Sequence, residues 1–276
     1  MVEISIVLVL LTAIIIGVMQ TTTLIGDSRL ARAQTLTKQS PVKDLSGLVL
    51  WLETSLEESF ILNEIENGQA ISKWKDIKEN TLQDNDATQT NSANQPTYQE
   101  KAFNDSIPGI RFDGSNHYLG FDGDAIINSS YTAFVVEKRT SNSTENYFIG
   151  GTTAASYQNL VFGYQGNTTI LHSNHNTHLT HSMPAYVSDV ERIHSFTFDM
   201  INREYYLNGG ASADASDTVA SPITAFEGSS IGRYRSAYKY YQGDIAEIII
   251  FNKMLNDEDR NSVEDYLSKK YDIKLN

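Results

Sequence analysis

Four histidines recur at every third position of one short segment. They are His172, His175, His178 and His181, in the run LHSNHNTHLTHS. A neutral imidazole is a good ligand for a transition metal, so His172, His175 and His178 are candidate metal ligands. Residues three apart point to opposite faces of a regular strand, and a shared site would therefore need a loop or a bulge. The alternative is a polar turn between two strands, which is the interpretation we favour.

Paired carboxylates would support a different chemistry, the hydrolysis of glycosidic bonds. That reaction uses two carboxyl groups about 5–9 Å apart, one on each side of the bond. The best candidate pair is Asp244 and Glu247, in the run GDIAEIIIFN. Their separation of three places them on opposite faces of a regular strand. We therefore predict a structural role for Glu247, no catalytic residue, and a protein that is not an enzyme.

Three aspartates stand beside glycines in the run FDGSNHYLGFDGD. They are Asp113, Asp122 and Asp124. Carboxylates and backbone carbonyls are the ligands that calcium prefers, so calcium is the one candidate cofactor. The same residue types are common in turns, and we favour a turn at each aspartate.

A basic and aromatic segment, residues 233–241, interrupts an otherwise acidic chain. It contains Arg233, Tyr234, Arg235, Tyr238 and Tyr240. Tyrosine offers a flat face and a hydroxyl to a sugar, and arginine can fork onto an anionic group. We predict that these five residues contact a glycan or a partner surface. The alternative is a hairpin whose tyrosines pack on the edge of the fold.

The elements that must position these residues follow from patterning. Apolar runs bounded by turn residues begin after Pro41 and predict short strands. The predicted strands are residues 45–52, 107–112, 131–137, 147–150, 160–164, 192–200, 204–209 and 243–252. A closing helix begins at Asn256, which can cap it, and Val263, Leu267 and Tyr271 lie on its apolar stripe. Residues 80–98 are polar and predict a surface loop. The body of the chain therefore predicts a mainly β, two-sheet antiparallel sandwich with a short C-terminal helix.

The N-terminal segment is different in character. Ile4–Met19 reads ISIVLVLLTAIIIGVM, and with its uncharged flank it approaches the ~20 residues that a membrane-spanning helix needs. The first proline is Pro41, so the helix can continue as a polar rod to about Lys38. We predict a long N-terminal transmembrane helix within residues 1–40 and a sandwich domain over residues 41–276.

Composition excludes several classes of function. The 276 residues carry a formal charge of −13, which argues against a general nucleic-acid binder, because such proteins neutralise phosphates with a basic surface. The chain has no cysteine, which excludes disulfides, cysteine-ligated zinc and thiol catalysis.

The run VEISIVLVLL, which contains Glu3, resembles the start of a mature type IV pilin or pseudopilin. The resemblance implies that Glu3 pairs with the N-terminal amine of a neighbouring pilin-like subunit, where an unpaired charge would be costly. It also implies a bacterial inner-membrane location with an exported domain, and an extracellular pilus after assembly. The start Met1-Val2-Glu3 departs from the family pattern, which has a basic leader and a glycine before the cut. A plain membrane anchor is the alternative.

The rest of the chain, about residues 45–275, is similar to bacterial concanavalin A-like, laminin G-like domains. The similarity rests on the runs LVLWL (48–52), WKD (74–76), GIRFDG (109–114), YYLNG (205–209) and GDIAEIIIFN (243–252). It implies a jelly-roll sandwich that binds glycans or proteins, and some relatives are glycosidases.

Together these resemblances predict a pilin-like subunit that displays a lectin-like domain for surface adhesion or filament assembly. Its expected partners are other such subunits, the inner membrane before assembly and a glycan or host-surface ligand, with no nucleic acid. One alternative is a monomeric, membrane-anchored module that binds a glycan or a protein. Another is an anchored glycosidase.

Overall fold

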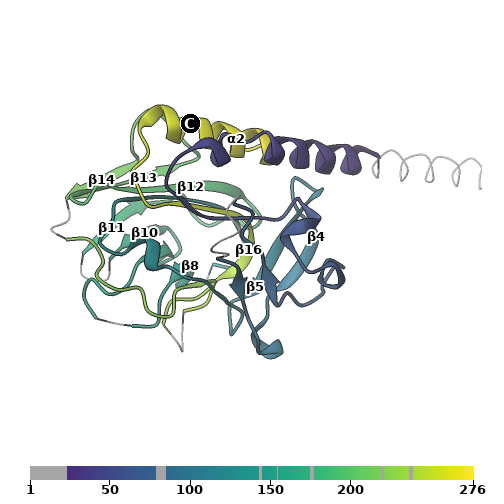
Figure 1. Ribbon diagram of the computed structural model, residues 1–276, viewed down its shortest axis with the longest axis horizontal. Helices are drawn as coiled ribbons and strands as arrows, with labels where there is room; N and C mark the ends of the chain where they lie inside the picture. The colour runs from purple at the N-terminus through teal and green to yellow at the C-terminus, as the bar shows by residue number, and fades with distance from the viewer. Residues whose placement is uncertain are drawn as a thin grey trace, which may run out of the picture.

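The computed structural model describes residues 24–78, 85–142, 145–153, 155–174, 177–218, 221–235 and 239–276. They form two eight-stranded antiparallel sheets packed face to face, with two helices along the outer face of one sheet (Figure 1). The predicted two-sheet antiparallel sandwich is confirmed.

The first sheet carries the long strands. Its order is β14-β13-β12-β7-β16-β5-β4, and β1 also pairs with β16. The bounds are β1 Leu48–Glu53, β4 Thr97–Phe103, β5 Ile107–Asp113, β7 Tyr131–Arg139, β12 Glu191–Phe198, β13 Asn202–Leu207, β14 Ala215–Thr218 and β16 Gln242–Phe251.

The second sheet is built from shorter strands, in the order β11-β10-β9-β8-β15-β6-β3-β2. The bounds are β2 Lys73–Trp74, β3 Ala87–Thr88, β6 Leu119–Gly120, β8 Asn146–Gly150, β9 Val161–Tyr164, β10 Thr169–Ser173, β11 His178–Ser182 and β15 Ser230–Ile231. Short 3-10 helices lie in the connections, at Pro41–Asp44, Glu57–Ser59, Leu62–Glu64, Ser92–Asn94 and Asp124–Ile126.

Two helices cover the first sheet. Helix α2, Asp257–Tyr271, begins as predicted at Asn256, whose side chain accepts a hydrogen bond from the backbone of Asp259. The second helical segment, residues 24–38, buries Ala33 and Thr37 in the same layer. Both helices are therefore part of the packed structure.

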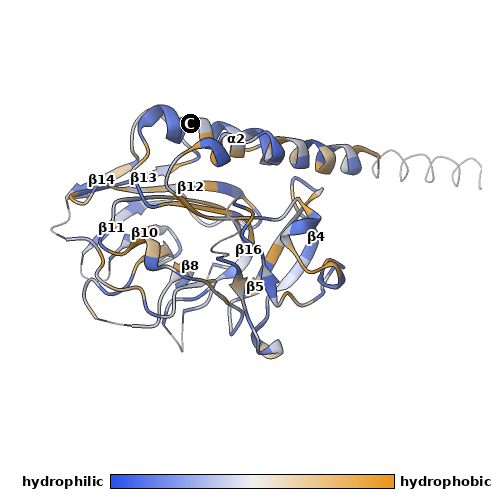
Figure 2. Ribbon diagram, in the orientation of Figure 1, coloured by the Kyte–Doolittle hydropathy of each residue, from blue (hydrophilic) through white to orange (hydrophobic). Residues whose placement is uncertain are grey.

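The first sheet is apolar on both faces because both faces are covered. Strand β16 directs Ile245, Ile248 and Ile250 into the core between the sheets, and Ile249 and Phe251 toward the helices. Figure 2 shows the hydrophobic colouring along β12 and β16. A continuous apolar run is the pattern that a strand buried on both sides requires.

A β-bulge interrupts β16. Its register against β7 shifts between Ile245 and Glu247, so two residues of β16 occupy the space of one. The shift reverses the alternation and turns Glu247 toward the helices, on the same face as Asp244. The prediction that these two carboxylates lie on opposite faces is therefore wrong, because it assumed a regular strand.

The expected transmembrane helix needs a correction. Among the described residues, no helix is long and apolar enough to cross a membrane. This finding contradicts a fold class that includes a transmembrane helix, and with it the inner-membrane location. The described part of this region is the segment 24–38, which packs on the sandwich through Ala33 and Thr37. Ile4–Met19 and Glu3 lie outside the described residues.

Candidate functional site

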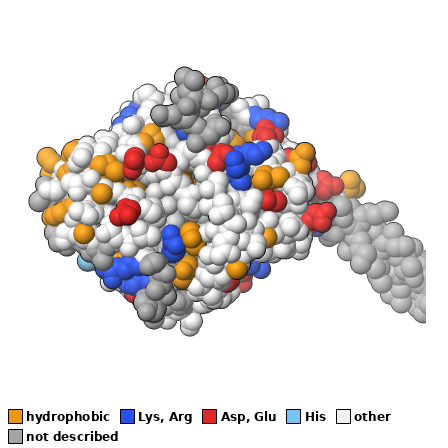
Figure 3. Space-filling view, turned by 60° about the horizontal axis from the view of Figure 1, so that its bottom comes forward, with side chains coloured by type: hydrophobic (Ala, Val, Ile, Leu, Met, Phe, Trp, Pro, Cys, Tyr) orange, Lys and Arg blue, Asp and Glu red, His pale blue; other side chains and the backbone are white. Residues whose placement is uncertain are grey.

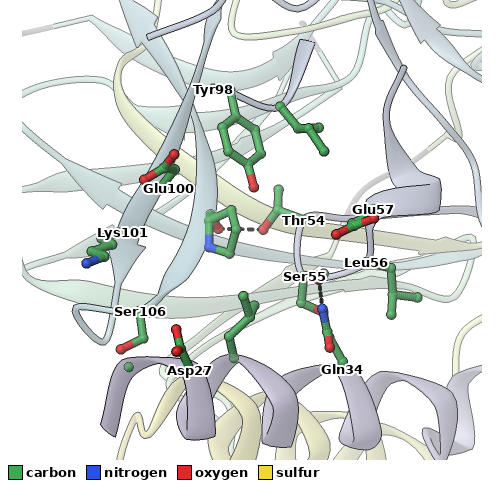
Figure 4. A pocket seen from close by; sticks show the side chains of 14 residues that line it. Asp27, Gln34, Thr54, Ser55, Leu56, Glu57, Tyr98, Glu100, Lys101 and Ser106 are labelled. Atoms are coloured by element: carbon green, nitrogen blue, oxygen red, sulfur yellow. Dashed lines mark hydrogen bonds between the residues drawn. The ribbon is translucent and has the colours of Figure 1, made fainter. Parts of the chain in front are cut away.

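A cavity of about 260 Å³ opens where the helical segment 24–38 meets the sandwich (Figure 4). Its walls come from the turn after β1, from β4, and from the connection into β5. The volume is slightly below the roughly 300 Å³ at which small-molecule sites usually begin, so it suits one small ring better than a large ligand. We name this cavity the Tyr98 pocket, after a tyrosine that lines it.

The turn after β1 forms one wall because Glu53 shapes it. The buried Glu53 carboxylate accepts hydrogen bonds from the backbone N–H groups of Ser55 (2.8 Å) and Leu56 (2.9 Å). It also accepts from the hydroxyls of Ser55 (2.6 Å) and Ser59 (2.7 Å). These bonds satisfy donors that the end of a strand would leave unpaired, and they curl the chain around the carboxylate.

Two further hydrogen bonds fix the walls to each other. The Thr54 hydroxyl donates to the carbonyl oxygen of Pro108 at 2.5 Å, which joins the turn to β5. The Gln34 side-chain amide donates to the carbonyl oxygen of Ser55 at 3.0 Å, which joins the helical segment to the same turn (Figure 4). The pocket is therefore held by three separate parts of the chain.

Tyr98 brings a hydrogen-bonding group into the pocket. The residue is 8% exposed, and its ring meets Phe60 edge to face with 5.3 Å between the ring centroids. Figure 4 shows the hydroxyl pointing toward Thr54, and within the described residues it makes no hydrogen bond. Burial, together with nearby carboxylates such as Glu100, raises the pKa of Tyr98 well above its ordinary value. The hydroxyl therefore stays protonated and can donate to a ligand.

The mouth of the pocket is charged. Asp27, Glu57 and Glu100 line it together with Lys101, and all four side chains are exposed. In Figure 4 the carboxylates lie on different sides of the opening. An apolar and aromatic floor with a few polar groups at the edge is the usual form of a small-ligand site.

The predicted histidine site is not assembled. His172 belongs to β10 and His178 to β11, which are paired antiparallel strands joined by residues 174–177, an arrangement compatible with the favoured interpretation of a polar turn between two strands. His172 is buried in the core and bonds the Tyr131 hydroxyl at 2.6 Å, whereas His178 is exposed on the other face. His175 lies outside the described residues. No group of three metal-binding side chains occurs in the part of the chain that the structure describes.

His172 leads to a prediction about acid stability. Burial, with the charge of Arg203, lowers the pKa of His172 well below 6.5. The unfolded histidine binds a proton as pH falls through about 6.5 while the folded one does not, so stability falls on acidification. Replacing His172 with Gln removes this titrating group. The free energy of unfolding should then fall less steeply below pH 6.5, by up to about 1.4 kcal/mol per pH unit. Urea unfolding at several pH values in this range measures the free energy of unfolding. If its dependence on pH is the same in the variant and the wild type, His172 is not the group responsible.

The predicted basic and aromatic segment lies on the second sheet. Tyr234 is buried and its ring meets Tyr147 at 5.2 Å, while the Arg233 guanidinium lies 3.6 Å above the ring of Tyr118. Tyr240 is half-buried. The remaining two predicted contacts are Arg235, whose guanidinium is 5.4 Å from the Tyr234 ring, and Tyr238, which lies outside the described residues.

Figure 3 shows one face of the molecule, on which Lys and Arg side chains form separate groups between Asp and Glu.

The aspartates considered for calcium act in turns. One Asp113 oxygen accepts three backbone N–H bonds, from Ser115, Asn116 and His117, at 2.9 to 3.1 Å. Asp122 accepts one from the backbone of Asp124 at 2.9 Å. This is the turn geometry that we favoured for these residues.

The carboxylates considered for catalysis are held by structural partners. Asp244 forms two hydrogen bonds of 2.8 Å with the Arg111 guanidinium. Glu247 accepts from Trp51 (2.7 Å) and is bonded by Lys270 (2.8 Å). Both carboxylates are fully buried, so neither faces a ligand.

Comparisons with known proteins place the fold. No protein-family model matches the sequence. A comparison with curated proteins also gives no match. Among solved structures, a Trypanosoma rangeli sialidase in complex with sialic acid is similar over 82% of this chain and 33% of its own, with TM-score 0.55 and 15% identity.

Two other solved structures have a similar fold. A GH54 α-L-arabinofuranosidase soaked with 4-nitrophenyl α-L-arabinofuranoside covers 73% of this chain and 51% of its own, with TM-score 0.55 and 13% identity. Domain 4 of AbnA, a GH43 extracellular arabinanase from Geobacillus stearothermophilus, in complex with arabinotriose, covers 79% of this chain and 97% of its own, with TM-score 0.50 and 13% identity. This chain spans about a third of the sialidase but nearly all of domain 4.

These likenesses show a β-sandwich fold, which confirms the sandwich part of the predicted resemblance. The pilin-like part finds no support among them. The prediction that the chain is not an enzyme is contradicted, because the sialidase, the arabinanase and the arabinofuranosidase are all named as glycosidases.

Proposed function

We propose that this chain is a carbohydrate-binding domain that holds one sugar residue of a glycan in the Tyr98 pocket. The observation that carries the proposal is Tyr98, a largely buried tyrosine whose hydroxyl opens onto the cavity, stays protonated and has no protein hydrogen-bond partner among the described residues. This hydroxyl can therefore exchange a hydrogen bond with water for one with a ligand hydroxyl. The likeness to domain 4, which was solved with arabinotriose, supports the same class of ligand.

The first test is calorimetric titration of the full chain with arabinotriose and a panel of neutral, amino and acidic oligosaccharides. Replacing Tyr98 with Phe keeps the ring and removes the hydroxyl. We expect affinity for the bound sugar to fall about two- to tenfold, the cost of one hydrogen bond. The thermal midpoint should change little, because no other described group depends on that hydroxyl.

A matched control separates two candidate sites. Tyr240→Phe makes the same change in the segment 233–241, which we also proposed from the sequence as a ligand contact. Weaker binding in Tyr98→Phe alone supports the pocket. Weaker binding in Tyr240→Phe alone moves the ligand to the segment 233–241 and contradicts the proposed site.

Glycoside hydrolysis is the second candidate function. The pocket has Glu57 and Glu100 on different sides of its mouth, and paired carboxylates are what the reaction uses. The titrated samples are therefore assayed for new reducing ends. Release of reducing ends that stops in both Glu57→Gln and Glu100→Gln would establish hydrolysis, whereas binding without release supports a binding domain.

Assembly with pilin-like subunits through Glu3 stays a prediction, as does a boundary at residue 40. Residues 1–23 lie outside the described residues, so no described contact bears on the role of Glu3. Mass spectrometry of a sheared filament fraction would test it, and absence of the chain from filaments would contradict it.

A further inference from the structure

The Tyr98 pocket has an unusual charge balance. Three carboxylates, those of Asp27, Glu57 and Glu100, stand at its mouth against one ammonium group, that of Lys101. They come from the helical segment 24–38, from the turn after β1 and from β4, so the fold brings together charges that are distant in the sequence.

Among the described residues, these carboxylates make no bond that stabilises the fold. None of the three side chains forms a hydrogen bond or an ion pair within the described structure. This contrasts with Glu53, which lies behind the same wall and is bonded by Lys270 and by two serines. The three carboxylates at the pocket are exposed and therefore accessible to a ligand.

A second observation points to a ligand at the same place. The Tyr98 side chain is more than nine-tenths buried, and its hydroxyl is directed into the cavity without a partner among the described residues. Burial and the negative charges of Glu100, Glu53 and Glu57 raise the pKa of Tyr98, and three carboxylates against one ammonium give the mouth of the pocket a net negative charge. A ligand that suits it offers an oxygen to the tyrosine and a positive group to the carboxylates.

We propose that the Tyr98 pocket prefers a sugar with a free, protonated amine, such as glucosamine, over the same sugar with its amine acetylated and over an acidic sugar. The inference rests on the proposed function and specifies its ligand class. The sugar hydroxyls would meet Tyr98 and the buried floor, and the ammonium would lie among the three carboxylates. A sialic acid would bring a carboxylate into this field and be repelled, and the net charge of −13 adds to that repulsion at a distance.

The experiment titrates the full chain with three probes: the β-1,4-linked glucosamine dimer, its N,N′-diacetylated form and 3′-sialyllactose. We expect the free amine to bind about tenfold more tightly than the acetylated dimer, since each exposed ion pair contributes about two- to fivefold. The sialylated probe should bind most weakly. Salt of about 1 M, where charges are screened within ~3 Å, should remove most of the preference for the amine.

Variants assign the preference to the pocket. Glu57→Gln and Glu100→Gln should each weaken binding of the amine dimer about two- to fivefold, and by a larger factor than binding of the acetylated dimer. Glu258→Gln, an exposed glutamate in the first turn of α2, is the matched control and should change neither. Circular dichroism checks that each variant is folded.

The outcomes separate this inference from the proposed function. Equal affinity for the amine and acetylated dimers, with both weakened by Tyr98→Phe, overturns the charge preference and supports sugar binding. Tighter binding of 3′-sialyllactose also overturns the preference. Failure of every sugar in the panel, arabinotriose included, overturns the proposed function itself. An amine preference that survives in Glu57→Gln and Glu100→Gln shows that the pocket does not cause it.

Discussion

Replacing Lys270 with Met should destabilise the protein by about 3–5 kcal/mol, a large part of the stability of an ordinary domain. The reason lies in the first sheet, where Glu53 on β1 and Glu247 on β16 are directly opposite each other. Like charges in that position repel. The Lys270 ammonium, from α2, lies 2.8 Å from a carboxylate oxygen of each, and all three side chains are completely buried. Without it, two buried carboxylates would keep their neutral hydrogen-bond donors but face each other without the positive charge that joins them.

The dependence on pH gives this prediction a sharper form. Burial alone would raise the pKa of Glu53, but the charge and hydrogen bond of Lys270 outweigh burial and hold the pKa below 4.5. In the wild type this stabilisation is complete above pH 4.5 and is lost as pH falls further, through the folded pKa. In Lys270→Met burial is no longer opposed by the ammonium, so the pKa of Glu53 would rise and a proton bound on acidification would relieve the repulsion. The difference in stability between the two proteins should therefore be largest at neutral pH and shrink toward pH 4.5.

Denaturant unfolding at several pH values measures that difference. Lys269→Met is the control, because Lys269 is 61% exposed and pairs with Asp265 at 3.5 Å on the surface. It should cost no more than about 0.5 kcal/mol. If Lys270→Met and the control have the same free energy of unfolding at neutral pH, the two glutamates do not both carry a charge in the folded protein.

The sequence contained a signal for this lysine. The apolar stripe of the closing helix runs through Val263, Tyr266, Leu267 and Tyr271, and Lys270 falls on the same side by its spacing. By position alone, Lys269 and Lys270 both lie in the last turn of the helix, where a positive charge is favourable. A lysine on an apolar stripe predicts buried partners of opposite charge. In the structure these partners are Glu53 and Glu247.

The strands were predictable where the apolar pattern is long. The alternation of β12, with Phe196 and Phe198 inside and Ser195 outside, follows from the residue types. Strand β4 was missed because its sequence, TYQEKAF, is mostly polar and adjoins a segment predicted as a loop. The bulge in β16 could not be predicted either, since it depends on the register against β7.

The Tyr98 pocket could not be predicted, for a related reason. Tyr98 lay at the end of the segment predicted as a loop, and Glu57 and Asp27 are ordinary surface residues by type. Their relation appears when the helical segment 24–38 packs on the sandwich and Gln34 bonds the turn after β1. A site assembled from separate elements with exposed residues leaves no local pattern in the chain.

The centre of the sandwich carries the second large prediction. Glu137 on β7 is completely buried between the sheets and accepts hydrogen bonds from the hydroxyls of Tyr164 (2.7 Å) and Tyr241. Its carboxylate also lies 2.9 Å from the His194 ring. Burial would raise the pKa of Glu137, but His194 and Arg192 outweigh it and hold the pKa below its ordinary value, so the carboxylate stays ionised. Three surrounding groups thus depend on one acceptor.

We expect Glu137→Ala to cost about 3–5 kcal/mol, because it opens a cavity and leaves buried donors unpaired. Glu137→Gln keeps the volume and one acceptor and should cost about 1–3 kcal/mol. The decisive comparison repeats Glu137→Ala in a protein that already carries Tyr164→Phe and Tyr241→Phe. If unpaired hydroxyls cause the loss, Glu137→Ala costs less there, by at least about 1 kcal/mol in a double-mutant cycle. An equal loss in both backgrounds would assign the effect to the cavity alone and reject the carboxylate as the centre of a hydrogen-bond network.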